Sequence, residues 1–145
     1  MAKIFRFLED FEMETLIETA DHQTYQPEEF LINEGDPLSS LFIIDRGTVK
    51  VVREHVGFTV DLAEVGAGNI FGEMSFVEGR PASASVQAVD EVDAVIISNR
   101  HILGIIRDNP GFYGRFYHSL AEILSRRVRE TTEKFTAGDT PWMEK

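Results

Sequence analysis

The sequence contains no cysteine, which excludes disulfide bonds, thiolate metal sites and cysteine nucleophiles. No run of apolar residues approaches the roughly 18 needed to span a membrane, and the first residues lack the apolar stretch of a secretory signal. Basic residues are few: 14 Lys and Arg stand against 25 Asp and Glu, a formal net charge of −11. Such a chain is not attracted as a whole to nucleic acid or anionic membranes. We therefore expect a cytoplasmic protein without a membrane partner, in which an anionic ligand needs a local positive site.

Motifs for catalysis and metal binding are also absent. None of the four histidines has the spacing of a zinc or iron site, such as Glu-x-x-His, and there is no Gly-x-Ser-x-Gly nucleophile turn. Asp and Glu residues are spread over the middle of the chain, and none has a recognisable second catalytic residue beside it. From these absences we expect no enzyme activity, no metal and no cofactor.

The chain does have enough apolar residues for one folded domain, since 43% of its 145 residues are hydrophobic and 27% are charged. Apolar residues three and four positions apart predict short helices within residues 3–20. Residues 24–98 instead carry β-branched and aromatic runs divided by glycine turns, which is typical of a sandwich, barrel or jelly roll. The last strand of this β body is predicted at about residues 86–97.

Two helices are expected after the β body. Ser98 can cap a helix over Asn99–Asp108. Asn109 can cap a second helix, which begins at Pro110 and runs to about Phe135. At 1.5 Å per residue this second helix is about 37 Å long, more than so small a domain needs. Its apolar stripe therefore either forms the seam of a homodimer or packs entirely on the domain's own sheet, and residues 136–145 are predicted to be a flexible tail.

The most informative segment is N-I-F-G-E-M-S-F-V-E-G-R-P-A-S-A-S-V-Q-A, residues 69–88. It puts a Gly-Glu pair at the end of a strand, followed by a short helical turn and a return strand. The first backbone N–H groups of a helix lack intrahelical acceptors, so those of Met74 and Ser75 can donate to a phosphate. Gly72 lets a ligand come close, and Glu73 can accept a hydrogen bond from a ribose hydroxyl. The alternative is a plain Gly-Glu turn that joins two strands.

Together with its neighbours, this segment resembles the cyclic-nucleotide-binding domain family, of the cyclic-AMP receptor protein and kinase regulatory-subunit type. The resemblance spans residues 5–135 and rests on residues 25–36, 41–51, 68–74 and 81–86, with a closing match at residues 125–134. It implies a mainly β fold with flanking helices: a β jelly roll with N-terminal helices and a long C-terminal helix. The domain is then expected at residues 1–135.

By this resemblance, the Phe-Gly-Glu segment is the phosphate-binding cassette. Glu73 is expected to hold the ribose 2′-hydroxyl, and Ser83 to contact the phosphate through its own hydroxyl. Thr131 and Thr132 are expected to face the base; otherwise they are exposed or seam-facing residues of the long helix. The candidate ligand-binding residues are Phe71, Gly72, Glu73, Met74, Ser75, Arg80, Ala82, Ser83, Thr131 and Thr132.

One position departs from the family's pattern. The family's cassette ends in Pro-Arg-Ala-Ala-Thr-Val, and its arginine pairs with the cyclic phosphate, whereas this chain reads Pro-Ala-Ser-Ala-Ser-Val from Pro81 to Val86. Ala82 stands in the arginine's place. Hydrogen bonds to charged groups contribute roughly 1.5–3 kcal/mol each, so the loss weakens binding by about ten- to a few-hundred-fold. Arg80 either compensates by folding inward or is an ordinary surface arginine.

The combined features predict a non-enzymatic regulatory module. A cyclic nucleotide, cyclic AMP or cyclic GMP, is expected to order residues 72–85 and to move the two closing helices, which changes a homodimer or protein-partner surface. Two alternatives remain: a ligand-independent interaction or dimerisation module with a degenerate pocket, which Ala82 favours, and a binder of cyclic dinucleotides. Only ten residues follow the long helix, too few for a helix-turn-helix, so direct DNA binding is not expected.

Overall fold

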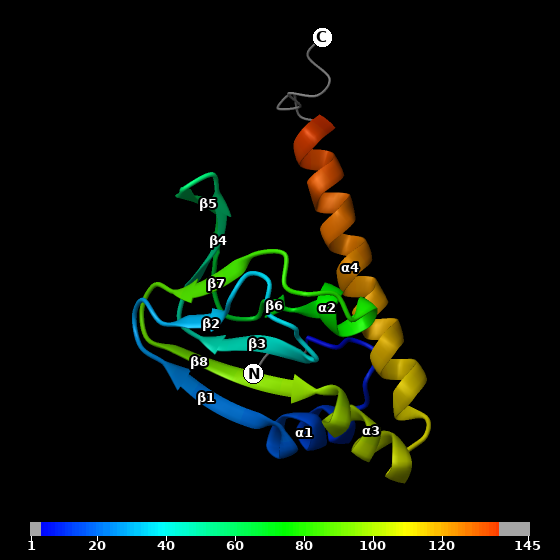
Figure 1. The fold of residues 1–145 in the computed structure, drawn as a ribbon. Coiled ribbons are helices and arrows are strands. Elements are labelled where there is room, and N and C mark those ends of the chain that lie inside the picture. Colours follow the sequence, from blue (N-terminus) through cyan, green and yellow to red (C-terminus); the bar gives the residue numbers. More distant parts are fainter. Residues whose placement is uncertain (1–3, 137–145) are drawn as a thin grey trace.

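Two antiparallel β-sheets and a group of helices make up the fold of the computed structural model, which describes residues 4–136 without the side chains of Met74 and residues 131–136 (Figure 1). One sheet has the order β1-β8-β3-β6, with β1 (Asp21–Tyr25), β8 (Val92–Ser98), β3 (Ser40–Arg46) and β6 (Ile70–Phe71). The other has the order β2-β7-β4-β5, with β2 (Phe30–Ile32), β7 (Ser85–Ala88), β4 (Val49–His55) and β5 (Phe58–Val65). The β jelly roll with flanking helices is therefore confirmed.

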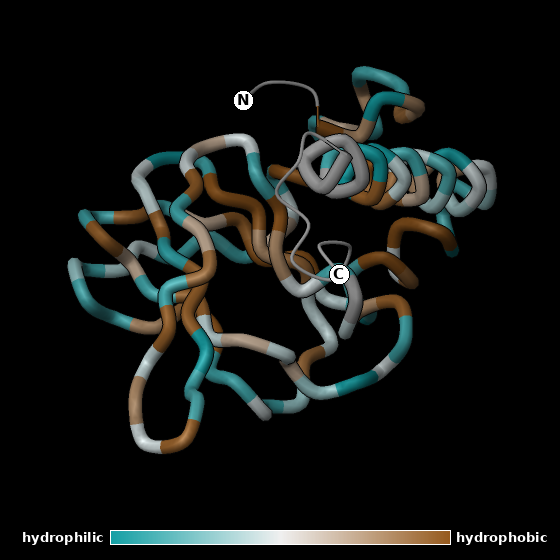
Figure 2. Tube along the Cα trace, turned by 90° about the horizontal axis from the view of Figure 1, so that it is seen from above, coloured by the Kyte–Doolittle hydropathy of each residue, from teal (hydrophilic) through white to brown (hydrophobic). Residues whose placement is uncertain are grey.

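The strands β3 and β8 in the middle of the sheet β1-β8-β3-β6 are largely buried on both faces, which explains the continuous apolar run in β3, whereas the edge strand β1 is mostly exposed. Successive side chains of a strand point to opposite faces. Leu41 and Ile43 accordingly pack in a core shared with the helices, whereas Phe42 and Ile44 pack in a second core with residues of the other sheet. Seen from above, the helices gather on one side of the sheets (Figure 2). The strands β3 and β8 thus join the helices to the sheet that contains β7.

The strand predicted at residues 86–97 is wrong in one respect, because the chain divides it into β7 and β8, which lie in different sheets. Between them, Asp90 Oδ1 accepts from the backbone N–H of Thr48 at 2.7 Å. Gly47 permits this crossing, since a Cβ there would lie 2.3 Å from the carbonyl oxygen of Glu91. Both strands are apolar, so the hydropathy pattern hides the turn between them.

The helices follow the sequence closely. The N-terminal helix α1 occupies Asp10–Thr19 within the predicted helical region, and α3 occupies Asn99–Asp108 as predicted. Ser98 caps α3 by accepting from the backbone N–H of His101 at 3.1 Å. The long helix α4 (Phe112–Thr136) begins two residues later than expected, because residues 110–111 form a turn in which the N–H of Phe112 donates to the backbone oxygen of Asn109 at 3.0 Å. The side chain of Asn109 donates to Glu12 at 2.7 Å.

The C-terminal end of α4, drawn orange to red, extends beyond the sheets in the same direction as the β4–β5 hairpin (Figure 1). Among the described residues, no helix is long and apolar enough to cross a membrane. Of the tail predicted at residues 136–145, only Thr136 lies within the described residues, where it ends α4. The division into a domain of residues 1–135 and a flexible tail stays a prediction.

Candidate ligand-binding site

The Gly-Glu pair lies where β6 passes into the short helix α2 (Glu73–Glu78). Gly72 has φ +83°, and a Cβ at this position would lie 2.9 Å from the backbone oxygen of Ser40 in the neighbouring strand. Both the left-handed backbone and the close approach of β3 therefore require glycine here. This turn fixes Glu73 as the first residue of α2.

A cavity of about 230 Å³ lies between this turn, the segment before and within β7, and α4. Its walls are mostly apolar, and Glu73 and Arg127 are the charged residues among them. The lining residues are Ile32, Leu38, Val51, Phe71, Gly72, Glu73, Ser75, Ala82, Ser83, Ala84, Val86 and Arg127. A small, largely apolar cavity with a few convergent polar groups is the usual form of a ligand site.

Arg127 of α4 meets Glu73 at the wall of this cavity. Its Nη1 donates to Glu73 Oε1 at 2.5 Å, and its Nη2 donates to the backbone oxygen of Ile70 at 2.6 Å. The side chain of Arg127 is 33% exposed and that of Glu73 is 13% exposed. The pair therefore ties α4 to both β6 and α2 while part of the guanidinium faces solvent.

The cassette end of the cavity is held by backbone hydrogen bonds. The N–H of Ala82 donates to the oxygen of Asp36 at 2.9 Å, and the oxygen of Ala82 accepts from the N–H of Gly35 at 2.8 Å. Farther along, Ser85 Oγ accepts from the backbone N–H of Glu34 at 2.8 Å. These bonds hold the segment that leads into β7 against the connection between β2 and β3, and they place the small, buried side chain of Ala82 on the cavity wall.

Most of the predicted site residues whose side chains are described meet at this cavity. Those that line it are Phe71, Gly72, Glu73, Ser75, Ala82 and Ser83. Arg80 does not: its side chain is 78% exposed and lies 3.9 Å from the carboxylate of Glu78. The side chains of Met74, Thr131 and Thr132 lie outside the described ones, so their predicted roles are untested.

Arg127 lines the cavity but is not among the residues predicted from the sequence. The spacing of α4 contains a signal for it, because Arg127 precedes Thr131 by four residues, and residues four apart share a helix face. The apolar walls were missed as well. Ile32, Leu38 and Val51 come from separate strands and connections, and only the fold brings them to one cavity.

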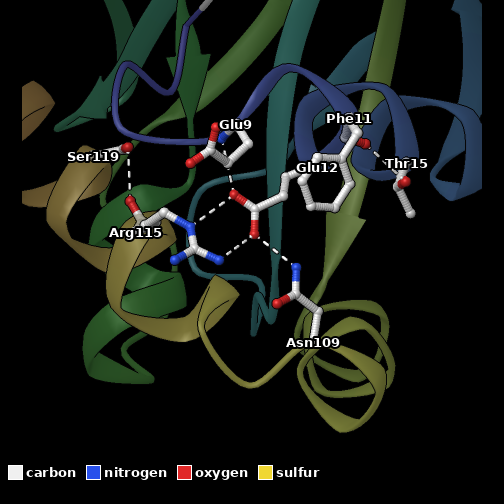
Figure 3. Close-up of polar contacts among 7 residues, drawn as sticks. All are labelled: Glu9, Phe11, Glu12, Thr15, Asn109, Arg115 and Ser119. Carbon is white, nitrogen blue, oxygen red and sulfur yellow. Dashed lines mark hydrogen bonds and ion pairs between the residues drawn. The ribbon is translucent and has the colours of Figure 1, made fainter.

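A second carboxylate–guanidinium pair lies near the N-terminal end of α4 (Figure 3). Glu12 is 1% exposed, and its two oxygens accept from Arg115 Nε at 2.8 Å, Arg115 Nη2 at 2.7 Å, Asn109 Nδ2 at 2.7 Å and the N–H of Glu9 at 2.8 Å. The hydrogen bonds from Arg115 are the largest cause of the low pKa of Glu12, which falls from 4.5 to about 2, although desolvation opposes the change. The same pairing raises the pKa of Arg115.

Glu12 also lines a larger cavity of about 510 Å³ between α1 and α3. None of the predicted ligand-binding residues lines it, and the oxygens of Glu12 are occupied by protein donors. Among the described side chains, no three His, Asp or Glu residues are grouped so that they could hold a metal ion. The smaller cavity at Glu73 is therefore the better candidate site.

Comparison with known proteins decides the family. The profile of the cyclic nucleotide-binding domain matches residues 22–109, which include all of the cavity residues except Arg127. The chain belongs to the cyclic nucleotide-binding domain family. Members of this family are regulatory binding domains, and the relatives found include a receptor protein and a kinase regulatory subunit.

Individual cyclic nucleotide-binding relatives agree with this assignment. The chain is 30% identical over 128 residues to the cyclic AMP receptor protein of Thermus thermophilus, covering 88% of this chain and 57% of that protein. It is 30% identical over 89 residues to the cAMP-dependent protein kinase type II regulatory subunit of Drosophila melanogaster, covering 61% of this chain and 24% of the relative. The crystal structure of the Thermus thermophilus catabolite activator protein matches with a TM-score of 0.77 at 28% identity, covering 92% of this chain and 62% of that one. This chain therefore corresponds to only part of each relative.

Proposed function

We propose that this domain binds a cyclic nucleotide, cyclic AMP or cyclic GMP, in the cavity lined by Glu73 and Arg127. The observation that carries the proposal is the meeting of a carboxylate from α2 and a guanidinium from α4 at the wall of a mostly apolar cavity. Such a wall suits a ligand that combines a flat base, sugar hydroxyls and a negatively charged phosphate. Membership of the cyclic nucleotide-binding domain family supports the same ligand class.

Each polar residue of the cavity has a role in this proposal. A carboxylate can accept about four hydrogen bonds, so Glu73 can accept from the ribose 2′-hydroxyl while it holds Arg127. Ser83 lines the cavity and offers its hydroxyl to the phosphate. Thr131 and Thr132 follow Arg127 by about one turn of α4. In this proposal they face the base, which agrees with their place one turn after Arg127.

The regulatory step of the proposal is a movement of α4. Arg127 connects α4 to the cavity, so a ligand that enters changes the contacts of this side chain and, with them, the position of the helix. Residues 72–85 adjust at the same time, because they form the other wall. The exposed side of α4, on which Val128 is 67% exposed, then offers an altered surface to a second copy or a protein partner.

Calorimetry with paired ligands tests the binding proposal. Wild-type protein is expected to bind cyclic AMP or cyclic GMP more tightly than the corresponding 2′-deoxy compound, by about tenfold or more, because a hydrogen bond to a carboxylate is lost. Glu73→Gln keeps the shape but not the charge, and it should bind both compounds with nearly equal, weaker affinity. The exposed Glu78→Gln on the same helix serves as the control. Absence of heat with either cyclic mononucleotide at millimolar concentration contradicts the proposal.

Ala82 favours a second candidate, an interaction or dimerisation module that works without a ligand. Its small, buried side chain places no cation on the cassette wall. Sedimentation of the wild type and of Val128→Glu compares the two: a dimer that needs Val128 and does not respond to nucleotides supports the interaction module. Binding of cyclic di-GMP, without binding of either mononucleotide, would instead assign the cavity to a cyclic dinucleotide.

A further inference from the structure

The proposed ligand carries a negative phosphate, yet the cassette wall of the cavity has no basic side chain. Ala82 lies on this wall, with both backbone groups bonded to the connection between β2 and β3. The residues that follow it on the wall, Ser83 and Ala84, are uncharged. The chain as a whole has a net charge of −11, so no long-range field compensates for the missing cation.

The nearby arginines differ in their access to the cavity. Arg80 does not line it, and its side chain is 78% exposed beside Glu78. Arg53 is 60% exposed, lies 3.9 Å from Glu34 and does not line the cavity either. Among the described lining residues, Arg127 alone is basic.

Arg127 reaches the cavity from α4 and is fixed there by two acceptors, the carboxylate of Glu73 and the backbone oxygen of Ile70. A guanidinium presents five N–H donors in a planar fork, which allows it to contact a carboxylate and a phosphate together. It also keeps its charge at any physiological pH. The side chain that holds the sugar-binding carboxylate is therefore also suited to hold the phosphate.

We infer that Arg127 is the counter-charge of the ligand's phosphate in this chain and takes over the task of the cassette arginine from a different element. This inference rests on the proposed binding of a cyclic nucleotide. Its consequence is that the ligand's negative charge is neutralised by α4 rather than by the cassette. Ligand affinity then depends directly on where α4 lies, and by reciprocity the ligand controls the helix.

A double-mutant cycle between Arg127 and Ala82 tests this assignment, with cyclic AMP and cyclic GMP as the probes. Arg127→Gln should weaken binding by about ten- to a hundredfold, because a charge-assisted contact is lost. Ala82→Arg should strengthen binding only moderately in the wild type, which already has one cation. In the Arg127→Gln background the same Ala82→Arg change should restore most of the lost affinity, since the two cations substitute for each other.

The matched control is Arg129→Gln, which removes the same charge from an exposed position of the same helix. Its affinity should stay within about twofold of the wild type, because an exposed charge is screened by solvent. Far-ultraviolet circular dichroism and the thermal midpoint of each variant check that all of them fold.

The outcomes separate the two proposals. If Ala82→Arg strengthens binding by the same factor with and without Arg127, Arg127 acts only by holding Glu73, and the inference is overturned. Unchanged affinity in Arg127→Gln overturns it as well. Coupling of about tenfold or more between the two positions supports it. Wild-type protein that binds neither nucleotide, even at millimolar concentration, overturns the proposed function itself.

Discussion

Two arginines of α4 each pair with a glutamate, but the two pairs have different surroundings. Around Glu12, four protein donors satisfy the carboxylate and its exposed fraction is 1%, so it has no acceptor capacity left for a ligand although it borders the larger cavity. Around Glu73, Arg127 is the one side-chain donor among the described residues, and 13% of the glutamate side chain is exposed at the wall of the smaller cavity. The difference teaches that one type of ion pair can serve two purposes: a carboxylate saturated by protein donors fixes a helix, whereas a carboxylate with unused acceptor capacity can also bind a ligand.

The saturated pair should give the largest loss of stability when it is broken. Glu12→Gln keeps the size of the side chain but leaves the guanidinium of Arg115 without its carboxylate, and breaking a buried pair costs about 3–5 kcal/mol. Because Arg115 is 37% exposed, we expect a loss of about 3 kcal/mol in the free energy of unfolding, measured in urea at pH 7. Glu14→Gln, an exposed position of the same helix, should change it by less than about 0.5 kcal/mol. A loss below about 1 kcal/mol for Glu12→Gln would show that the pair is not structural.

Acid should weaken the wild type through the same carboxylate. The folded state lowers the pKa of Glu12 from 4.5 to about 2, so its stabilising effect is complete above pH 4.5 and disappears as the pH falls towards 2. The difference corresponds to about 3 kcal/mol. Unfolding measured across this range should therefore be steeper in pH for the wild type than for Glu12→Gln. Parallel curves would place the acid sensitivity in other carboxylates.

A smaller effect is expected at the glycine beside the saturated pair. A Cβ at Gly111 would lie 2.8 Å from Arg115 Nη2 and 2.9 Å from Nη1, so Gly111→Ala has to displace the guanidinium from Glu12. We expect a loss of about 1–2 kcal/mol in thermal or urea unfolding. Gly114→Ala is the matched control, since a Cβ there meets no atom within 4 Å, and it should stabilise α4 by about 0.5–1 kcal/mol. Equal effects of the two changes would contradict the packing argument.

The pair beside the cavity should give the smallest change in stability. Arg127→Gln is expected to lower the free energy of unfolding by no more than about 1 kcal/mol, because the carboxylate left behind, Glu73, is 13% exposed at a cavity wall, where solvent can replace part of the lost interaction. Urea unfolding without ligand gives this value, with Arg129→Gln as the reference. A loss as large as that of Glu12→Gln would mean that both pairs are structural, and the contrast between them would fail.

Local patterns were sufficient for much of this molecule. Apolar periodicity and capping residues predicted α3, and the Gly-Glu pair predicted the turn in which Gly72 has to be glycine. The same patterns gave no sign that Glu12 would be buried, because a glutamate on an amphipathic helix is normally exposed. Its partner Arg115 is 103 positions away in the chain, a distance over which periodicity carries no information.

The sequence by itself determined most of the helices, the β character of the middle of the chain and the family, and by resemblance it predicts that Ala82 stands where other members have an arginine. Those properties depend on residues close together in the chain, whose types and spacing favour one local backbone conformation. Only the tertiary structure decided which charges meet. Glu73 and Arg127 are 54 positions apart, and they come together because the jelly roll and the packing of α4 fix where both side chains lie. Charge pairing across a cavity is a property of the folded surface, so it becomes visible only when the chain has folded.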